Sequence, residues 1–239
     1  MNIEIFQKGF NFSQDGPGNR LVYHLCGCNM RCPWCANPEG LAHGQGGVDV
    51  QEVADEVLRS SAMFFDGGGV TFTGGEPTMQ YEALSFLLQY LHTSGIDTCI
   101  ETNASHPQLP ELFAYIDHLI MDFKQPFADK HLSLTGVKQE VIIRNLRRAC
   151  KEHQDVLIHI PLVNGYNTSN EELHGMAAFL ASLPQSNMRV EPLWYHEYGK
   201  PKWEKLGLEY TVKNGTLTEM QKQSVLDVLH KYGLRIART

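Results

Sequence analysis

The sequence predicts a protein of the α/β class, in which parallel strands alternate with helices. Six short aliphatic or β-branched runs recur along the chain, and segments with apolar residues at helical spacing separate them. N-cap signals precede several of these segments. Six strand–helix units are too few for a closed eight-stranded barrel, so the choice lies between an open doubly wound sheet and a partial barrel. Both architectures place chemistry at the carboxyl ends of the strands.

The strand candidates are the runs at 20–25, 69–73, 97–101, 118–122, 156–162 and 188–193. The segments between them repeat apolar residues at i, i+3, i+4 and i+7, which is typical of amphipathic helices. Residues 194–215 lack a clear period, and we expect an irregular segment there that carries function.

Helix boundaries are marked by local signals. Asp49 with Glu52, Ser169 with Glu172, and Thr218 with Gln221 each combine an N-cap residue with a reciprocal partner three positions later. Gly233 is expected to close the last helix, and 234–237 to form a closing strand or a docking tail.

The composition indicates one packed domain over residues 1–239. Hydrophobic residues make up 42% and charged residues 20% of the chain, which excludes disordered and fibrous classes. Twenty Lys and Arg against 27 Asp and Glu give a formal charge of −7, which argues against a partner with a nucleic-acid backbone. No apolar stretch approaches the roughly 18 residues of a membrane span, and no signal peptide is evident. We therefore expect a cytoplasmic protein that binds no membrane.

The loop after the first strand carries the strongest functional signal. Cys28, Cys32 and Cys35 have the spacing C-x3-C-x2-C, and such a cluster in a cytosolic chain is typical of a metal or redox site. Three thiolates on one loop can reach three irons of a cubane cluster and leave the fourth iron without a protein ligand. The alternative is a structural zinc site, which would need a fourth ligand such as Cys26 or His24.

Glycine and polar residues gather at the ends of three further strands. Gly74, Gly75 and Glu76 follow the second strand, where glycines let a ligand approach the backbone and a carboxylate can accept from an amino group. Glu101 with Asn103, and Asp122 with Lys124, are spaced two apart, so each pair shares one face of its strand. A tight turn and solvent-exposed strand ends are the alternatives.

In these motifs the chain resembles the radical S-adenosylmethionine enzymes, where this cysteine spacing holds a [4Fe–4S] cluster whose unique iron binds S-adenosylmethionine. The resemblance implies that Trp34 lies near the adenine and that the glycine-rich segment binds the methionine amino group. The cofactor-binding residues implied in this way are Trp34, Cys35, Ala36, Asn37, Gly74, Gly75, Glu76, Thr102, Asn103, Asp122, Phe123, Lys124 and His196.

Two further segments resemble a narrower family, the glycyl radical enzyme activating enzymes of the pyruvate formate-lyase type. These are EPLWYHEYGKPKWEKLGLEY at 191–210 and DGPGNR at 15–20, so the resemblance covers nearly the whole chain. It implies a partial (β/α)6 barrel of the TIM type, with His196 against the cofactor's ribose or adenine and with Tyr195 and Trp203 as packing residues. The chain lacks an eight-cysteine ferredoxin-like insertion, which favours this type over activators of dehydratases or decarboxylases.

The resemblance implies reductive cleavage of S-adenosylmethionine, followed by removal of a hydrogen atom from a glycine Cα of a partner such as pyruvate formate-lyase. A flavodoxin or ferredoxin would supply the electron. The alternatives are a radical S-adenosylmethionine enzyme acting on a small molecule or peptide, and a non-catalytic zinc module.

The sequence departs from this family at several positions. A monovalent cation is implied at Glu101, Thr102 and Asp122, but Glu101 stands where the pyruvate formate-lyase activator has an aspartate. His159 stands where that activator has an arginine. Cys26 has no role in the family, and we expect a packed strand cysteine.

Overall fold

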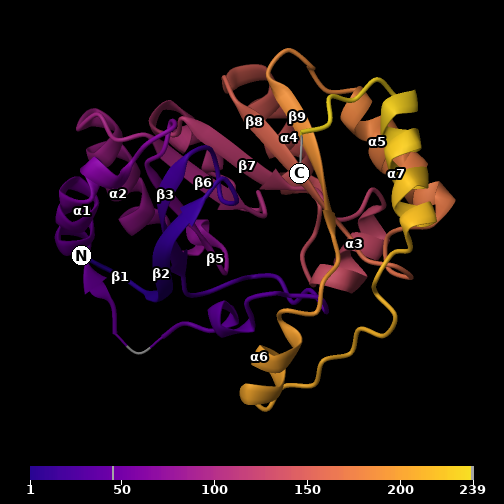
Figure 1. Ribbon diagram of the computed structural model, residues 1–239, viewed down its shortest axis with the longest axis horizontal. Helices are drawn as coiled ribbons and strands as arrows, with labels where there is room; N and C mark the ends of the chain where they lie inside the picture. The colour runs from indigo at the N-terminus through magenta and orange to yellow at the C-terminus, as the bar shows by residue number, and fades with distance from the viewer. Residues whose placement is uncertain (45, 238–239) are drawn as a thin grey trace.

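A computed structural model describes residues 1–44 and 46–237 and shows a curved sheet with helices along its outer face (Figure 1). The seven strands of this sheet lie in the order β2-β3-β5-β6-β7-β8-β9. A separate two-stranded sheet pairs β1 with β4. The bounds are β1 (Asn2–Ile3), β2 (Ile5–Phe12), β3 (Asn19–Leu25), β4 (Val48–Asp49), β5 (Val70–Gly74), β6 (Thr98–Thr102), β7 (His118–Asp122), β8 (Val156–Leu162) and β9 (Met188–Trp194).

All six predicted strands are present and parallel to one another, from β3 to β9. They follow one another in sequence order across the sheet, as in a barrel, whereas a doubly wound sheet reverses its order at a switch point. The partial barrel is therefore confirmed. Sequence reasoning missed β2, which pairs with β3 antiparallel and forms one edge.

The helices are α1 (Val50–Arg59), α2 (Tyr81–Thr93), α3 (Ala128–Thr135), α4 (Glu140–Glu152), α5 (Asn170–Ala181), α6 (Lys200–Lys205) and α7 (Glu219–Lys231), with shorter 3-10 helices at Pro38–Leu41, Ser61–Met63, Pro77–Gln80 and Leu109–Tyr115. The capping boxes at the starts of α5 and α7 are confirmed. Asp49 also caps α1, but its carboxylate accepts from the backbone of Gln51, and the reciprocal bond predicted from Glu52 is not formed.

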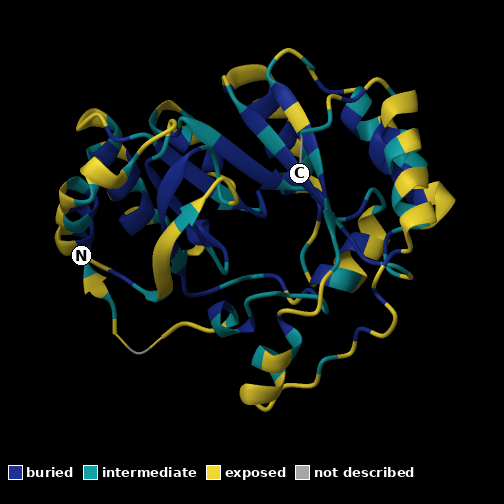
Figure 2. Ribbon diagram, viewed as in Figure 1, coloured by how far each residue is buried: buried dark blue, intermediate teal, exposed yellow. Residues whose placement is uncertain are grey.

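The strands bury two different faces. Leu21, Tyr23 and Leu25 of β3 point outward into a core shared with the helices, where Leu84 and Leu146 are also fully buried. Because side chains alternate along a strand, the residues between them face the inside of the barrel. Figure 2 shows the result: the inner strands of the sheet are largely buried, whereas most of β2 and the outer sides of the helices are exposed.

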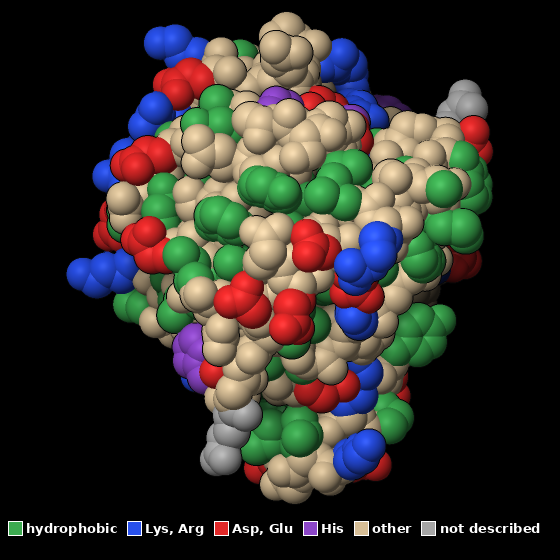
Figure 3. All heavy atoms as spheres, turned by 90° about the vertical axis from the view of Figure 1, so that its left-hand side faces the viewer, with side chains coloured by type: hydrophobic (Ala, Val, Ile, Leu, Met, Phe, Trp, Pro, Cys, Tyr) green, Lys and Arg blue, Asp and Glu red, His purple; other side chains and the backbone are tan. Residues whose placement is uncertain are grey.

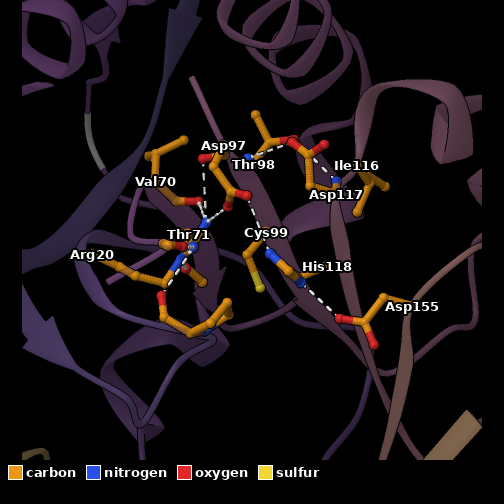
Figure 4. Close-up of polar contacts among 12 residues, drawn as sticks. Arg20, Val70, Thr71, Asp97, Thr98, Cys99, Ile116, Asp117, His118 and Asp155 are labelled. Atoms are coloured by element: carbon orange, nitrogen blue, oxygen red, sulfur yellow. Dashed lines mark hydrogen bonds and ion pairs between the residues drawn. The ribbon is translucent and has the colours of Figure 1, made fainter. Parts of the chain in front are cut away.

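At the amino ends of the strands, charged side chains form a ladder across the sheet (Figure 4). Nη2 of the buried Arg20 lies 2.7 Å from Oδ1 of Asp97. The ring nitrogens of His118 lie 3.1 Å from Asp97 and 2.7 Å from Asp155. Arg189 on β9 pairs with the other oxygen of Asp155. The five residues of this base ladder alternate in charge, so each has a partner of opposite sign.

The remaining predictions concern the tail and the surface. Val190 exchanges backbone hydrogen bonds with Arg235 and Ala237, so the tail contributes a single parallel bridge to the edge of β9. Figure 3 shows the side that carries α1 and α2, where acidic and basic side chains are interspersed. No helix within the described residues has both the length and the apolar character needed to cross a membrane.

Candidate cofactor site at the carboxyl end of the sheet

A cavity of about 230 Å³ lies at the carboxyl ends of the strands. It brings together residues that are up to 168 positions apart in the sequence, from the cysteine loop to the segment after β9. The predicted site residues that line it are Cys28, Cys32, Trp34, Cys35, Ala36, Asn37, Gly74, Gly75, Glu101, Asn103, Asp122, Lys124 and His196. Met30, Pro161, Leu162, Leu193 and Tyr195 supply further walls.

The three loop cysteines all border this cavity, and none forms a disulfide. Burial raises the pKa of the Cys28 and Cys32 thiols to about 11, and it also raises the pKa of Cys35. Within the described part of the chain, no three His, Cys, Asp or Glu side chains converge on a single ion. A cubane cluster spreads three thiolates over three irons, so this donor set fits an iron–sulfur cluster better than one zinc ion.

The glycine-rich loop after β5 packs directly against the cysteine loop. Gly74 has φ +117°, a conformation that side chains rarely adopt, and its Cβ would lie 2.3 Å from the nitrogen of Leu25. A Cβ on Gly75 would lie 2.3 Å from the carbonyl oxygen of Gly27. Glycine is therefore required at both positions, and the bare backbone they present to the cavity suits a ligand that approaches closely.

Glu76 does not line the cavity, although sequence reasoning placed it in contact with the cofactor. Its side chain is buried behind the loop, where Oε1 accepts from the hydroxyl of Thr102 at 2.7 Å and Oε2 accepts from the backbone of Asn103 at 2.6 Å. Thr78 donates to Oε1 as well. Burial raises the pKa of Glu76, and these hydrogen bonds oppose that shift. The carboxylate ties the β5 loop to the end of β6, so we assign it a supporting role.

Phe123 and Thr102 also lie behind the cavity lining. Phe123 is 1% exposed and packs on Phe179, with 4.8 Å between the ring centroids. Its side chain belongs to the core because it sits one position out of phase with Asp122 and Lys124, which face the cavity. Neither side chain borders the cavity, so a contact of these two residues with a cofactor stays a prediction for their backbone atoms.

Asp122 and Lys124 form an ion pair inside the cavity, with 2.7 Å between Oδ2 and Nζ. Burial opposes the charge of Lys124, but the carboxylate of Asp122 and the nearby cysteines raise its pKa, so the ammonium is retained. A fixed positive charge near the cysteine loop favours thiolate over thiol. It also suits the carboxylate of an amino-acid ligand.

Glu101 is held by protein donors on both oxygens. Oε1 lies 3.0 Å from Nδ1 of His159, and Oε2 accepts from the hydroxyl of Thr73 at 2.8 Å. Nε2 of His159 faces Glu191 at 3.3 Å. Burial disfavours the imidazolium, but the two carboxylates raise the pKa of His159, and hydrogen bonds from His159 lower that of Glu101.

The residues predicted for a monovalent cation do not fit one in this arrangement. Thr102 points behind the cavity lining to Glu76, Asp122 is paired with Lys124, and Glu101 is paired with His159. A positive side chain already neutralises each of the two cavity carboxylates. His159, whose role the sequence left open, supplies one of these charges.

The segment after β9 closes the cavity. His196 lines it, and its ring stacks on Tyr198 with 4.3 Å between centroids. Burial lowers the pKa of His196, which favours the neutral ring. Trp203, predicted to be a packing residue, packs edge-on against Tyr210 and also donates from its indole nitrogen to the carbonyl oxygen of Cys35 at 2.9 Å. Sequence spacing gave no signal for this contact. Cys26 is buried and lies outside the cavity lining.

Comparison with known proteins identifies this arrangement. The family model of the radical SAM superfamily matches residues 22–180. A pyruvate formate-lyase-activating enzyme from Staphylococcus epidermidis is 34% identical over 211 residues, which cover 84% of each chain. The enzyme of the same name from Staphylococcus aureus strain USA300 is 33% identical over the same shares.

Solved structures agree with this assignment. A domain of a pyruvate-formate lyase-activating enzyme from Bacteroides vulgatus superposes with a TM-score of 0.58 and 27% identity, covering 71% of this chain and 98% of that domain. A radical SAM methyltransferase from Sphaerobacter thermophilus has a TM-score of 0.68 at 19% identity, and the match covers 95% of this chain and 67% of the methyltransferase chain. At this identity, the match supports the fold alone. This chain is a radical SAM enzyme and belongs to the family of pyruvate formate-lyase-activating enzymes.

Proposed function

We propose that this chain activates a glycyl radical enzyme of the pyruvate formate-lyase type. The observation that carries the proposal is the cavity itself, which unites the C-x3-C-x2-C loop with the segment around His196. That combination occurs in a chain whose relatives named pyruvate formate-lyase-activating enzyme match over 84% of its length.

Cys28, Cys32 and Cys35 would hold a [4Fe–4S] cluster, with S-adenosylmethionine on the iron that has no protein ligand. When bound, these groups supply one-electron reductive cleavage of the cofactor to methionine and a 5′-deoxyadenosyl radical, which takes a hydrogen atom from the partner's glycine Cα. The free thiols are protonated at neutral pH, because burial raises the pKa of Cys28 and Cys32 to about 11 and also raises the pKa of Cys35. Loading of the site therefore releases protons.

The remaining cavity residues bind and orient the cofactor. The exposed backbone of Gly74 and Gly75 suits the methionine end, where the Lys124 ammonium offers a partner to its carboxylate. Trp34 and His196 suit the adenosyl end. No side chain is needed as an acid or base, so the contribution of these residues is orientation and the exclusion of water.

The open side of the barrel gives a protein partner access to the site. The sheet ends at β2 on one edge and at β9 on the other, and these strands are not neighbours. A glycine on a flexible loop of the partner can enter between them, whereas a closed barrel would admit only a small substrate. A flavodoxin or ferredoxin would deliver the electron to the cluster.

The test is electron paramagnetic resonance on anaerobically reconstituted protein mixed with a reductant, S-adenosylmethionine and pyruvate formate-lyase. A glycyl radical doublet, with 5′-deoxyadenosine formed in the same tube, is the expected result. A partner variant with the target glycine changed to alanine is the control and should give no doublet. Formation of 5′-deoxyadenosine without a doublet would contradict this partner and favour a small molecule or peptide substrate.

A further inference from the structure

We infer that Lys202 and Trp203 of α6 are positioning residues for the cofactor site. In this inference, Trp203 fixes the backbone of the third cysteine, and Lys202 orients the Asn37 amide so that its NH2 group faces the bound cofactor. The inference deepens the proposed function, because it concerns the same cavity. It assigns roles to two residues for which the sequence predicted no contact with the cofactor site.

The first contact is a hydrogen bond to the cysteine loop. The indole Nε1 of Trp203 donates to the carbonyl oxygen of Cys35 over 2.9 Å, across 168 positions of sequence. The backbone nitrogen of Cys35 is itself bonded to the carbonyl oxygen of Cys32 at 3.2 Å. Both backbone polar groups of the third cysteine are therefore held, which fixes the direction in which its thiol leaves the loop.

The second contact is a close approach of the two backbones. Gly199 immediately precedes α6, and a Cβ at this position would lie 2.5 Å from the carbonyl oxygen of Cys35 and 2.9 Å from Cα of Ala36. Gly199 has an ordinary helical φ of −73°, so glycine is required here by proximity and not by backbone strain. α6 therefore sits directly on the residues that line the cavity (Figure 1).

The third contact determines how the Asn37 side chain is oriented. Nζ of Lys202 donates to Oδ1 of Asn37 at 2.9 Å and lies 3.2 Å from Oε1 of Glu39. An ammonium group can only donate, so it holds the amide oxygen on the side of α6. The amide nitrogen must then point away from α6. Because Asn37 lines the cavity, this nitrogen offers a donor to the acceptor atoms of a bound nucleoside.

These contacts also explain how so short a helix is held. α6 has six residues, well below the length at which an isolated helix is stable in water. Its neighbours Tyr198 and Leu206 are exposed, so α6 is held by the bonds of Lys202 and Trp203 to the cysteine loop together with the packing of Trp203 on Tyr210. Removing them should loosen α6 and the third-cysteine loop together.

The chain offers a matched pair of lysines for the test. Lys202→Met removes the contacts to Asn37 and Glu39. Lys200→Met, on the same helix, removes only an ion pair with Glu197, which precedes the helix. After anaerobic reconstitution, we expect normal iron content in both. The dissociation constant for S-adenosylmethionine should rise about tenfold in Lys202→Met, as for residues that orient a ligand-binding group. It should change less than about twofold in Lys200→Met, and Lys202→Arg should restore most of the affinity.

Two further measurements separate positioning from a structural role. If Lys202 acts through Asn37, the double variant Lys202→Met with Asn37→Ala should bind no more weakly than Asn37→Ala alone. Trp203→Phe keeps an aromatic ring but removes the indole N–H that donates to Cys35. The reduction potential of the cluster and the electron paramagnetic resonance spectrum of its reduced form should therefore shift, while iron content stays the same.

Equal S-adenosylmethionine affinity in Lys202→Met and Lys200→Met would overturn the orienting role, as would additive effects of Lys202 and Asn37. An unchanged potential and spectrum in Trp203→Phe would overturn the positioning of Cys35. None of these measurements involves a partner protein. Failure of the glycyl radical assay with these effects intact would therefore contradict the proposed function and leave this inference standing.

Discussion

Both ends of the barrel pair their charged side chains, but only the carboxyl end arranges its polar groups around a cavity. At the amino ends of the strands, the base ladder from Arg20 to Arg189 pairs every charge with its neighbours, and Arg20 is fully buried. Figure 4 shows the ladder from Arg20 to Asp155. At the carboxyl ends, the Lys124 ammonium, the Asn103 amide and three thiols surround a cavity. At the amino ends, the charged side chains bond to one another and to nearby protein groups. At the carboxyl ends, polar side chains line a space that a ligand can fill.

The comparison teaches that a polar barrel interior is not in itself a sign of function. Arg20 is fully buried and His118 is half-buried, yet their hydrogen-bonding groups are directed at other protein groups: those of Arg20 at Thr71 and the Val70 carbonyl, and those of His118 at Asp97 and Asp155. The carboxyl end differs because its side chains converge on a cavity that can hold a ligand. The predictions below test this difference.

The largest expected effect is a difference in cofactor cleavage between variants of Cys32, which lines the cavity, and Cys99, which lies near the base ladder. Cys32→Ala should abolish cleavage of S-adenosylmethionine because it removes a cluster ligand. Cys99→Ala should leave cleavage nearly intact, since Cys99 is buried near the base ladder. The readout is 5′-deoxyadenosine formed per chain under reducing conditions. Full cleavage by the Cys32 variant would disprove the cluster assignment.

A large effect on stability is expected at the base. Arg20→Met removes the partner of Asp97 and of several carbonyl oxygens, so it leaves buried groups unpaired. The free energy of unfolding should fall by about 3–5 kcal/mol, measured by urea denaturation. A loss below about 1 kcal/mol would show that the base ladder contributes little.

A smaller loss is expected behind the cavity. Glu76→Gln keeps the shape of the side chain but replaces one acceptor oxygen with a donor, which then faces either the Asn103 backbone or the Thr102 hydroxyl. The cost should be about 1–3 kcal/mol of unfolding free energy. A stability equal to that of the unchanged protein, combined with weaker cofactor binding, would instead favour direct contact of Glu76 with the cofactor.

His196→Ala should weaken S-adenosylmethionine binding about tenfold, or about 1.4 kcal/mol, without loss of iron. Its side chain lines the cavity but lies outside the cysteine loop. Affinity and iron content can be measured on the same preparation. Equal loss of both would show that His196 is structural.

The smallest effect is a pH dependence at the base. Burial opposes the charge of His118, but Asp155 and Asp97 raise its pKa to about 9. A raised pKa means that its stabilising charge is fully present below the ordinary value of about 6.5 and is lost as pH rises through 9. The melting temperature should fall over this range, and His118→Gln should flatten the profile. An identical slope in that variant would assign the pH dependence to another group.

Sequence reasoning located the strands and the cavity because both depend on local pattern. Aliphatic and β-branched runs, separated by segments of helical period, predicted the six parallel strands, and the parallel arrangement then brought the cysteine loop, Gly74 and Asn103 to one edge. Strand β2 was missed because its exposed residues, including Phe10 and Phe12, do not follow the pattern of a buried strand.

The features of the site that the sequence did not reveal concern side-chain direction and long-range partners. Glu76 and Phe123 belong to the right loops, but their side chains turn into the protein. Trp203 acts at Cys35 across 168 positions, which no spacing rule describes. His159 neutralises Glu101 because β6 and β8 lie on either side of β7, a relation that only the folded sheet reveals.

The most direct test of the assignment of the carboxyl end as the cofactor site is the electron paramagnetic resonance spectrum of the reduced cluster, recorded with and without S-adenosylmethionine. If the carboxyl end of the barrel holds the cluster with one iron open to the cofactor, adding S-adenosylmethionine should change the spectrum of the unaltered protein and of Cys99→Ala alike. A spectrum that the cofactor leaves unchanged would contradict the assignment of this cavity.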